Sequence, residues 1–244
     1  MTAITCNHRH RLRALRVLVA GAVLLGLCAA TLLAGVGTDR ADAARAKMIG
    51  KTKRTPKPSC PKSPCEAIGS VTGFQASASG ARNPFKVRRN GRLVAWSVDL
   101  SRPKPSQRRF FGKFYRSESF GTAPSARISV IDPKKKDRYK LKRHSPAVGL
   151  NEHLGEKPIF TLAEPLSIKK GDILALTVPS WIPDFAVEQS ARNAWRASRP
   201  NNECSGERDI KASRPHEKLD STRVYGCTYR TARLLYWGFY TTGG

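Results

Sequence analysis

The stretch "KKGDILALTVPSWIPDF", residues 169–185, decides the fold class. A Gly-Asp turn at 171–172 opens it, and an unbroken run of aliphatic and β-branched residues follows from 173 to 178, which is the pattern of a buried strand. Pro179 has no N–H for a sheet ladder, so we expect the strand to end at Val178 and "SWIPDF" to form a tip. The chain around this strand is therefore predicted to be a β protein.

Similar runs, bounded by Gly, Pro, Asn or Asp, recur on both sides of this strand. Seven or more strands without helices between them favour a single antiparallel β-sandwich or jelly-roll-like domain. The expected strands are 68–75, 92–100, 126–131, 138–142, 158–162, 173–178 and 232–240.

One segment has helical spacing. In "SQRRFFGKFYR", residues 106–116, aromatic residues recur at helical intervals with basic residues between them, and Ser106 is the expected N-cap. We expect a short helix lying across the sandwich. The alternative is a basic amphipathic helix on a membrane surface. Residues 182–225 have little strand pattern apart from "AWRAS" at 194–198, and we expect a long loop there.

The first 43 residues have the pattern of a secretory signal peptide. Arginines precede an uncharged run from Val17 to Thr38, and the small residues "ADA" at 41–43 predict cleavage after Ala43. The run is also long enough to remain as a single membrane anchor. Either outcome leaves the rest of the chain outside the cell: a basic, Pro-rich linker at 44–65, expected to be extended rather than packed, and the sandwich at 66–244.

Four cysteines follow the signal: Cys60, Cys65, Cys204 and Cys227. An even number in an exported chain predicts disulfides, and proximity favours Cys60–Cys65 and Cys204–Cys227. Zinc is the alternative, because four residues separate Cys60 from Cys65, but the other two cysteines are not spaced as zinc ligands. We expect no metal and no cofactor.

The chain is strongly basic. It carries 44 Lys and Arg against 18 Asp and Glu, for a net charge of +26. Such a charge attracts anionic polymers and anionic membrane faces in a salt-sensitive manner. For an exported protein the expected partner is an anionic cell-envelope polymer or glycan, and no intracellular nucleic-acid role is expected. The alternative is a basic surface without a specific partner.

Two groups of residues are candidate binding sites. The cluster "KKKDRYKLKR" at 134–143 places cations on one face of a turn and strand, opposite two apolar side chains. That face is either simply solvated or a contact for an anionic polymer. The predicted contact residues are Lys134, Lys135, Lys136, Arg138, Lys140 and Lys142.

The tip "SWIPDF" is the other candidate. Trp181 and Phe185 offer aromatic faces and Asp184 a carboxylate, the residue types that stack on and hydrogen-bond to a sugar. The alternative, which we favour, is that Trp181 closes the end of the sandwich core.

No sequence motif for catalysis is evident. The histidines His144, His153 and His216 are not spaced as metal ligands, and HExxH, GxSxG and phosphate-loop motifs are absent. A glycan hydrolase would need two converging acids. The acids available for such a pair are Asp99, Asp132, Asp172, Asp184 and Glu188.

"PLSIKKGDILALTV" resembles the penultimate strands of extracellular jelly-roll and carbohydrate-binding-like modules. With the signal, the basic tail, the paired cysteines and the ending "ARLLYWGFY", the chain is similar to uncharacterised exported β-sandwich proteins of high-GC Gram-positive bacteria. The resemblance implies a fold and a location outside the cell, and no catalytic residues. We therefore expect a non-enzymatic, envelope-associated protein. The alternatives are a glycan-acting sandwich hydrolase and a structural surface protein with a protein partner.

Overall fold

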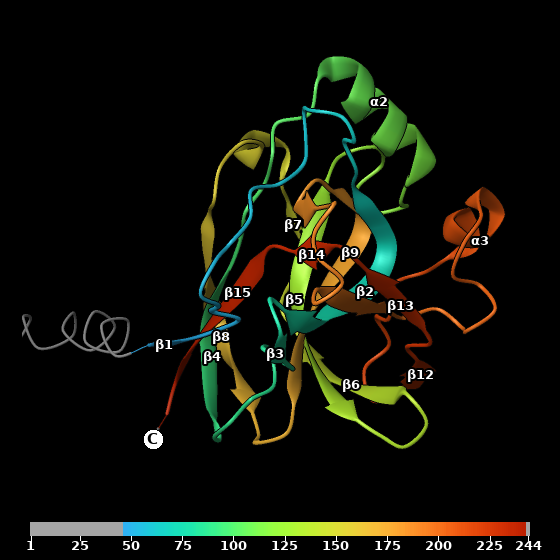
Figure 1. Ribbon diagram of the computed structural model, residues 1–244. Helices are drawn as coiled ribbons and strands as arrows, with labels where there is room; N and C mark the ends of the chain where they lie inside the picture. The colour runs from blue at the N-terminus through green and yellow to red at the C-terminus, as the bar shows by residue number, and fades with distance from the viewer. Residues whose placement is uncertain (1–45, 243–244) are drawn as a thin grey trace, which may run out of the picture. The chain divides into compact units, whose positions relative to one another are not determined.

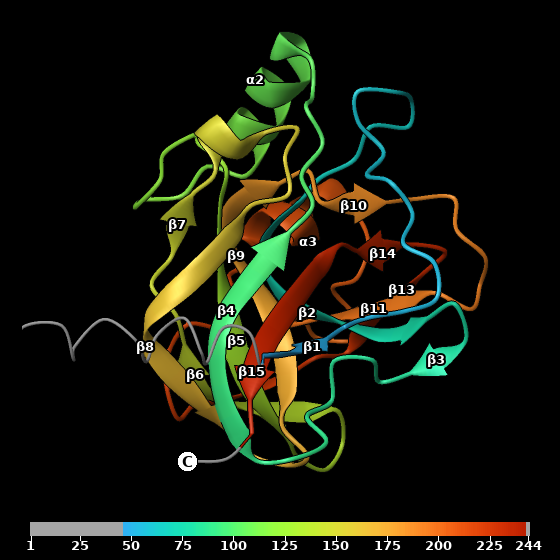
Figure 2. The same cartoon turned by 90° about the vertical axis from the view of Figure 1, so that its left-hand side faces the viewer.

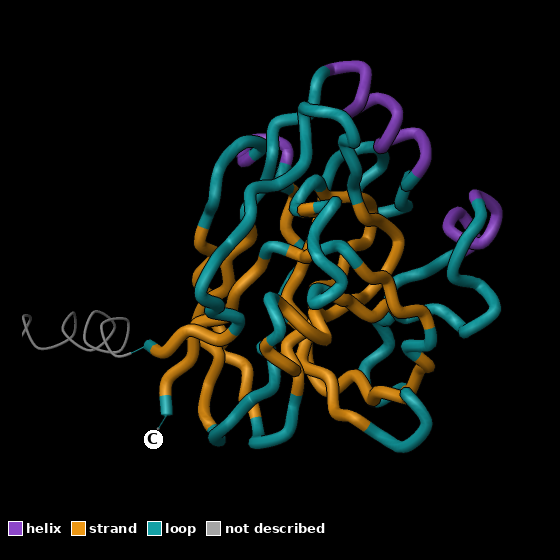
Figure 3. The backbone as a smooth tube through the Cα atoms, in the orientation of Figure 1, coloured by secondary structure: helices purple, strands orange, loops and turns teal. Residues whose placement is uncertain are grey.

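The computed structural model describes residues 46–242, so the predicted signal segment lies outside the described residues. Within 46–242, no helix is long and apolar enough to cross a membrane. The described part is mostly antiparallel β structure, as the sequence predicts (Figures 1 and 3).

The larger sheet has β9 in its middle. Its strand order is β12 (Thr222–Val224), β6 (Arg138–His144), β5 (Ser125–Pro133), β9 (Ile173–Ile182), β2 (Ile68–Ala78), β11 (Ala194–Ala197) and β13 (Cys227–Arg230); β3 (Ala81–Arg82) pairs with β2, and β7 (Val148–Gly149) with β5.

A four-stranded sheet, turned toward the viewer in Figure 2, forms the second layer. Its order is β1 (Lys47–Ile49), β15 (Tyr236–Thr241), β4 (Gly91–Val98) and β8 (Ile159–Ile168), and a separate short pair joins β10 (Phe185–Ala186) to β14 (Arg233–Leu234). The chain passes between the two layers repeatedly, which is the connectivity of a sandwich.

The two layers are in direct contact at β9 and β15. A Cβ atom on Gly238 would lie 2.3 Å from Leu174 Cδ1, so a larger residue there would displace the Leu174 side chain from the core. The Tyr236 hydroxyl donates a hydrogen bond across the core to the Leu174 carbonyl at 2.9 Å. These contacts fix the spacing of the sheets.

We predicted that strand β9 ends at Val178. This is wrong, because β9 continues to Ile182. Its partner β2 bulges between Gly69 and Val71, where Ser70 has a φ of 49°. Pro179 falls opposite this bulge, where the ladder is interrupted and no N–H is needed. "SWIPDF" is therefore largely strand and not a loop tip.

Helix α2 spans Pro105–Phe114 and lies at one end of the sandwich (Figures 1 and 2). The predicted Ser106 cap is wrong: the N-cap is Lys104, whose backbone N–H donates to Gln107 Oε1 at 2.7 Å. Proline suits the first helical position because its missing N–H would have no partner there. Among residues 46–242 the other helices are a 3₁₀ turn, Asn151–His153, and α3, Glu207–Ala212.

The basic segment before the sandwich is extended, as predicted, but it is packed rather than free. Residues 47–49 form β1 and pair with β15. Further along, Ser59 N–H donates to the Phe185 carbonyl at 3.0 Å. Within its described part, the predicted linker thus belongs to the sandwich.

Both predicted disulfides, Cys60–Cys65 and Cys204–Cys227, are present. The zinc alternative is therefore wrong. Cys227 is buried in the main core beside Tyr225, so the second disulfide ties the long 182–225 segment to β13.

The longer disulfide loop should matter more for stability. Replacing Cys204 and Cys227 by Ser should lower the free energy of unfolding by about 3 kcal/mol, because the bond restricts a longer unfolded loop, and replacing Cys60 and Cys65 by about 2 kcal/mol. The sequence separations are 23 and 5 residues. Urea unfolding of the two variants measures the difference, and an equal or reversed order would contradict the loop-entropy account.

Candidate functional site

Trp181 is only 1% exposed and packs against Phe111 of helix α2, with ring centroids 5.3 Å apart. Its indole N–H donates to the Thr122 carbonyl at 2.9 Å. Cys60 completes this small cluster. The ring has no free face for a sugar, so the predicted stacking platform is contradicted. The alternative interpretation, an aromatic residue closing the end of the core, agrees with this placement.

Asp184 and Phe185 are also buried, at 0% and 7% exposure. Burial raises the pKa of Asp184 well above its usual range, and the charge of Asp99 acts in the same direction. The N–H groups of Asp184 and Leu235 favour the charged form, but neither carboxylate oxygen has a hydrogen-bond partner of standard geometry among residues 46–242. Burial therefore favours the neutral form of Asp184 and also closes its carboxyl group off from a sugar.

Three of the other candidate acids, Asp132, Asp172 and Asp99, do not form an accessible pair, whereas Glu188 lies with Glu66 at a separate cavity of about 370 Å³. Asp132 pairs with Lys134 at 2.7 Å. Asp172 accepts from the Lys169 N–H at 2.8 Å and so closes the turn before β9. Asp99 lies near Asp184, but Asp184 is fully buried and cannot reach a substrate.

The predicted basic patch at 134–142 is partly neutralised. Tyr139 and Leu141 are buried and the cations of β6 face outward, as expected. However, Lys134, Lys140 and Lys142 pair with Asp132, Asp220 and Asp172 at 2.7, 2.9 and 3.1 Å. The remaining cations of the patch, all exposed, are Lys135, Lys136 and Arg138.

A second basic site, which the sequence did not reveal, is a cleft of about 1000 Å³. One wall is the packed basic segment before the sandwich, which contributes residues 51–56 and which we call the arm. The other walls are the β2–β3 hairpin and the loop before β11. No acid, histidine or cysteine lines it, and no ion pair within residues 46–242 involves its cations. We call this the arm cleft; its charged and polar lining is Lys51, Thr52, Lys53, Arg54, Thr55, Ser79, Gln189, Ser190, Arg192 and Asn193.

Buried side chains hold the walls of the arm cleft in place. Arg233, 3% exposed, donates to the Arg54 carbonyl at 2.7 Å and to Thr52 Oγ1 at 2.6 Å, which fixes the arm. On the opposite wall Asn193, 4% exposed, accepts from the Ser79 N–H at 3.0 Å. The cleft is thus built by the fold, and its lysine and arginine heads remain exposed.

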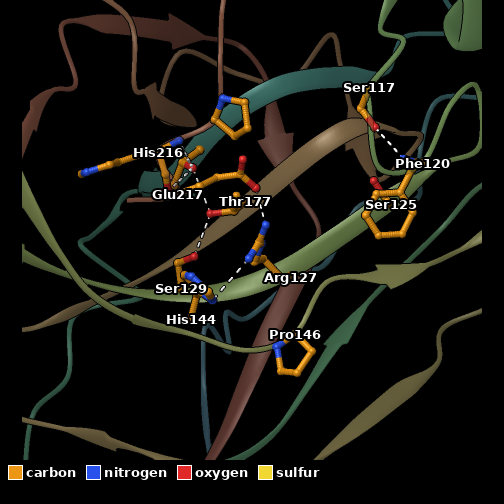
Figure 4. Close-up of polar contacts among 12 residues, drawn as sticks. Ser117, Phe120, Ser125, Arg127, Ser129, His144, Pro146, Thr177, His216 and Glu217 are labelled. Carbon is orange, nitrogen blue, oxygen red and sulfur yellow. Dashed lines mark hydrogen bonds and ion pairs between the residues drawn. The ribbon is translucent and has the colours of Figure 1, made fainter. Parts of the chain in front are cut away.

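A buried row of polar side chains crosses the outer face of the large sheet (Figure 4). Thr177 Oγ1 lies 2.7 Å from Ser129 Oγ and 2.9 Å from Thr72 Oγ1, and His216 N–H donates to Thr72 Oγ1. Arg127 beside the row forms an ion pair with Glu217. The row binds the 199–222 segment to the sheet, so its hydroxyls are already satisfied.

His216 and Ser221 lie within hydrogen-bond distance but are not a nucleophile and its base. Ser221 Oγ donates to the Lys218 carbonyl at 2.6 Å, so it accepts from His216 Nε2 at 2.9 Å. Activation would need the opposite direction. Burial, and secondarily the charge of Arg223, lowers the pKa of His216 to about 4, and the ring is neutral.

Comparison with protein-family models, with curated proteins and with solved structures finds no match to this chain. The site must therefore be argued from its own geometry. The sequence indicates a basic segment at 44–65 and a long loop at 182–225, but nothing local to either indicates that they face each other. The β1–β15 pairing, the Arg233 contacts and the hydrogen bond from Ser59 N–H to the Phe185 carbonyl bring them together.

Replacing Trp181 tests its placement. Trp181→Ala should lower the free energy of unfolding by about 3–5 kcal/mol, because a buried ring and its hydrogen bond are lost. Phe110→Ala on α2 is the matched control: that ring is 61% exposed, and its loss should change stability by less than about 0.5 kcal/mol. Urea unfolding of both variants measures this, and a near-neutral Trp181→Ala would contradict the burial.

Asp184 gives a pH-dependent prediction. The folded-state pKa is raised, so between the unfolded pKa and the folded pKa the native state binds more protons, and stability falls as pH rises. Asp184→Asn has no carboxyl group to ionise, so this pH-dependent fall in stability is absent. The free energy of unfolding of the variant, relative to that of the natural chain, should therefore increase with pH by up to about 1.4 kcal/mol per pH unit. Urea unfolding at pH 5 and pH 8 measures the effect.

Asp137→Asn is the control of opposite sign. The hydrogen bond from Arg196 lowers the pKa of Asp137, so its contribution to stability is present above the unfolded pKa and is lost only as pH falls below it. Between pH 5 and pH 8 this variant should be destabilised by a constant amount. A pH-independent difference for Asp184→Asn would show that Asp184 is ionised in the folded state.

Proposed function

We propose that this chain is an exported, envelope-associated protein that binds an anionic polymer in the arm cleft. The signal-like pattern at 1–43 supports export, and the two disulfides indicate an oxidising compartment outside the cytoplasm. The observation that carries the binding proposal is a cleft of about 1000 Å³ whose charged lining residues are all cationic.

The arm cleft is a better candidate than the 134–142 patch because its cations have no acidic partners within the described residues. A lysine already paired with a carboxylate must exchange that partner for the ligand and gains little. Lys51, Lys53, Arg54 and Arg192 are exposed and make no such pair. Their charges are therefore available to an incoming anion.

The chemistry of the lining favours binding to a repeating anion. Long cationic side chains contact charged groups along an extended chain, while Gln189, Ser190 and Thr55 offer neutral hydrogen bonds between them. Each contact displaces counterions from the polymer, so the affinity should fall steeply with salt. Neutral glycans lack that driving force and should bind weakly.

Two double variants with the same change in net charge test the location. Lys53→Gln with Arg192→Gln removes two cations of the cleft, and Lys134→Gln with Lys140→Gln removes two paired cations of the patch. Titration with long-chain polyphosphate and with polygalacturonate at several salt concentrations gives the slope of log affinity against log salt. The cleft variant should lower this slope by about one unit per lost contact.

The patch variant should keep the natural slope, and a neutral glycan should not bind either variant. If both double variants lose affinity equally, the attraction is diffuse and the arm cleft is not the site. If a neutral glycan binds and salt has no effect, the proposed function is wrong.

A further inference from the structure

Arg199 is a buried charge without an acidic partner. It is 5% exposed, and no ion pair within residues 46–242 includes it. Its guanidinium donates only to neutral groups, from Nε to Ser213 Oγ at 3.0 Å and from Nη1 to the Tyr229 hydroxyl at 2.7 Å. A buried cation normally pairs with an anion, because neutral partners do not fully replace its hydration.

This arginine lines a cavity of about 330 Å³, separate from the arm cleft and formed by different elements. Arg214 and Arg223 line the same cavity, and Glu203 is the acid among its lining residues. Three guanidinium groups against one carboxylate leave a local excess of positive charge. The volume is at the small end of the range for ligand pockets, so it suits a compact group.

Protein contacts already orient the two outer arginines. Arg223 donates from Nη1 to the carbonyls of Arg214 and Pro215 at 2.9 and 3.0 Å. Arg214 donates from Nη1 to the Lys211 and Ser213 carbonyls at 3.0 and 2.8 Å. In both, the hydrogen bonds engage one nitrogen of the guanidinium and leave the other donors for a ligand. Arginine binds tetrahedral oxyanions through two such donors at once.

We propose that Arg199, Arg214 and Arg223 form a binding site for a single phosphoryl or sulfate dianion, independent of the arm cleft. The dianion would supply the counter-charge that Arg199 lacks within the described residues. It would also bridge the segment around α3 to β12 and to the end of β11, since Arg214 follows α3, Arg223 lies in β12 and Arg199 follows β11. Occupancy of the site should therefore stabilise the 199–224 segment.

Calorimetric titration of the purified protein with inorganic phosphate and, separately, with sulfate tests the proposal, with chloride holding the ionic strength constant. We expect one saturable site per chain. Arg214→Gln and Arg223→Gln should each weaken binding by about 10-fold or more, the usual effect of losing a charge-assisted hydrogen bond. Arg208→Gln is the matched control, because Arg208 lies on α3 with its side chain 97% exposed, and it should bind as the natural chain does.

Titrations with glycerol phosphate, a monoester, and dimethyl phosphate, a diester, then show which kind of phosphate ester the site binds. Tight binding of the monoester and not of the diester would assign the site to a terminal phosphate; equal binding of sulfate and phosphate would assign it to either ester. No saturable binding of phosphate or sulfate would overturn the proposal. Binding by Arg214→Gln and Arg223→Gln as tight as that of the Arg208→Gln control would also overturn it, because these two arginines would then not contact the anion.

Discussion

All ten residues of the central strand β9 are buried, so other parts of the chain must pack on both of its faces. The rest of the structure depends on these two packing contacts. On the inner face Leu174 meets Gly238 and Tyr236 of the second sheet. On the outer face Thr177 joins a row of hydroxyls that is closed by His216. The long segment between β10 and β13 covers this outer face, so its first role is to bury β9.

That same segment supplies one wall of each basic cavity. Its first part brings Arg192 and Asn193 opposite the arm, and its later part brings Arg199, Arg214 and Arg223 together. Because acids are scarce in this chain, their positions decide which cations remain available. Asp132, Asp172 and Asp220 neutralise much of the patch at 134–142. Neither cavity contains comparable ion pairs with its lysines and arginines within the described residues.

The sequence was sufficient for the longer strands and the disulfides, because both depend on local pattern, but it did not predict the short strands such as β10 and β12 within 182–225. The run at 173–178 is apolar enough to specify a buried strand, and proximity favours Cys60–Cys65 and Cys204–Cys227. It was not sufficient for features that depend on a distant partner. Pro179 continues β9 because β2 bulges opposite it, and Trp181 is buried because α2 and the Cys60 loop pack over it. The arm cleft joins residues near 52 to residues near 192, and the buried Arg233 that fixes the arm has no local signature.

The arm cleft requires that the basic arm is part of the sandwich, since a free tether would leave no cleft. Amide hydrogen exchange distinguishes a docked arm from a free one. We expect slow exchange for peptides covering residues 47–50 and 59, where β1 pairs with β15, Gly50 N–H donates to the Pro84 carbonyl, and Ser59 N–H donates to the Phe185 carbonyl. Exchange of these amides at the rate of an unstructured peptide would contradict the docked arm and, with it, the arm cleft.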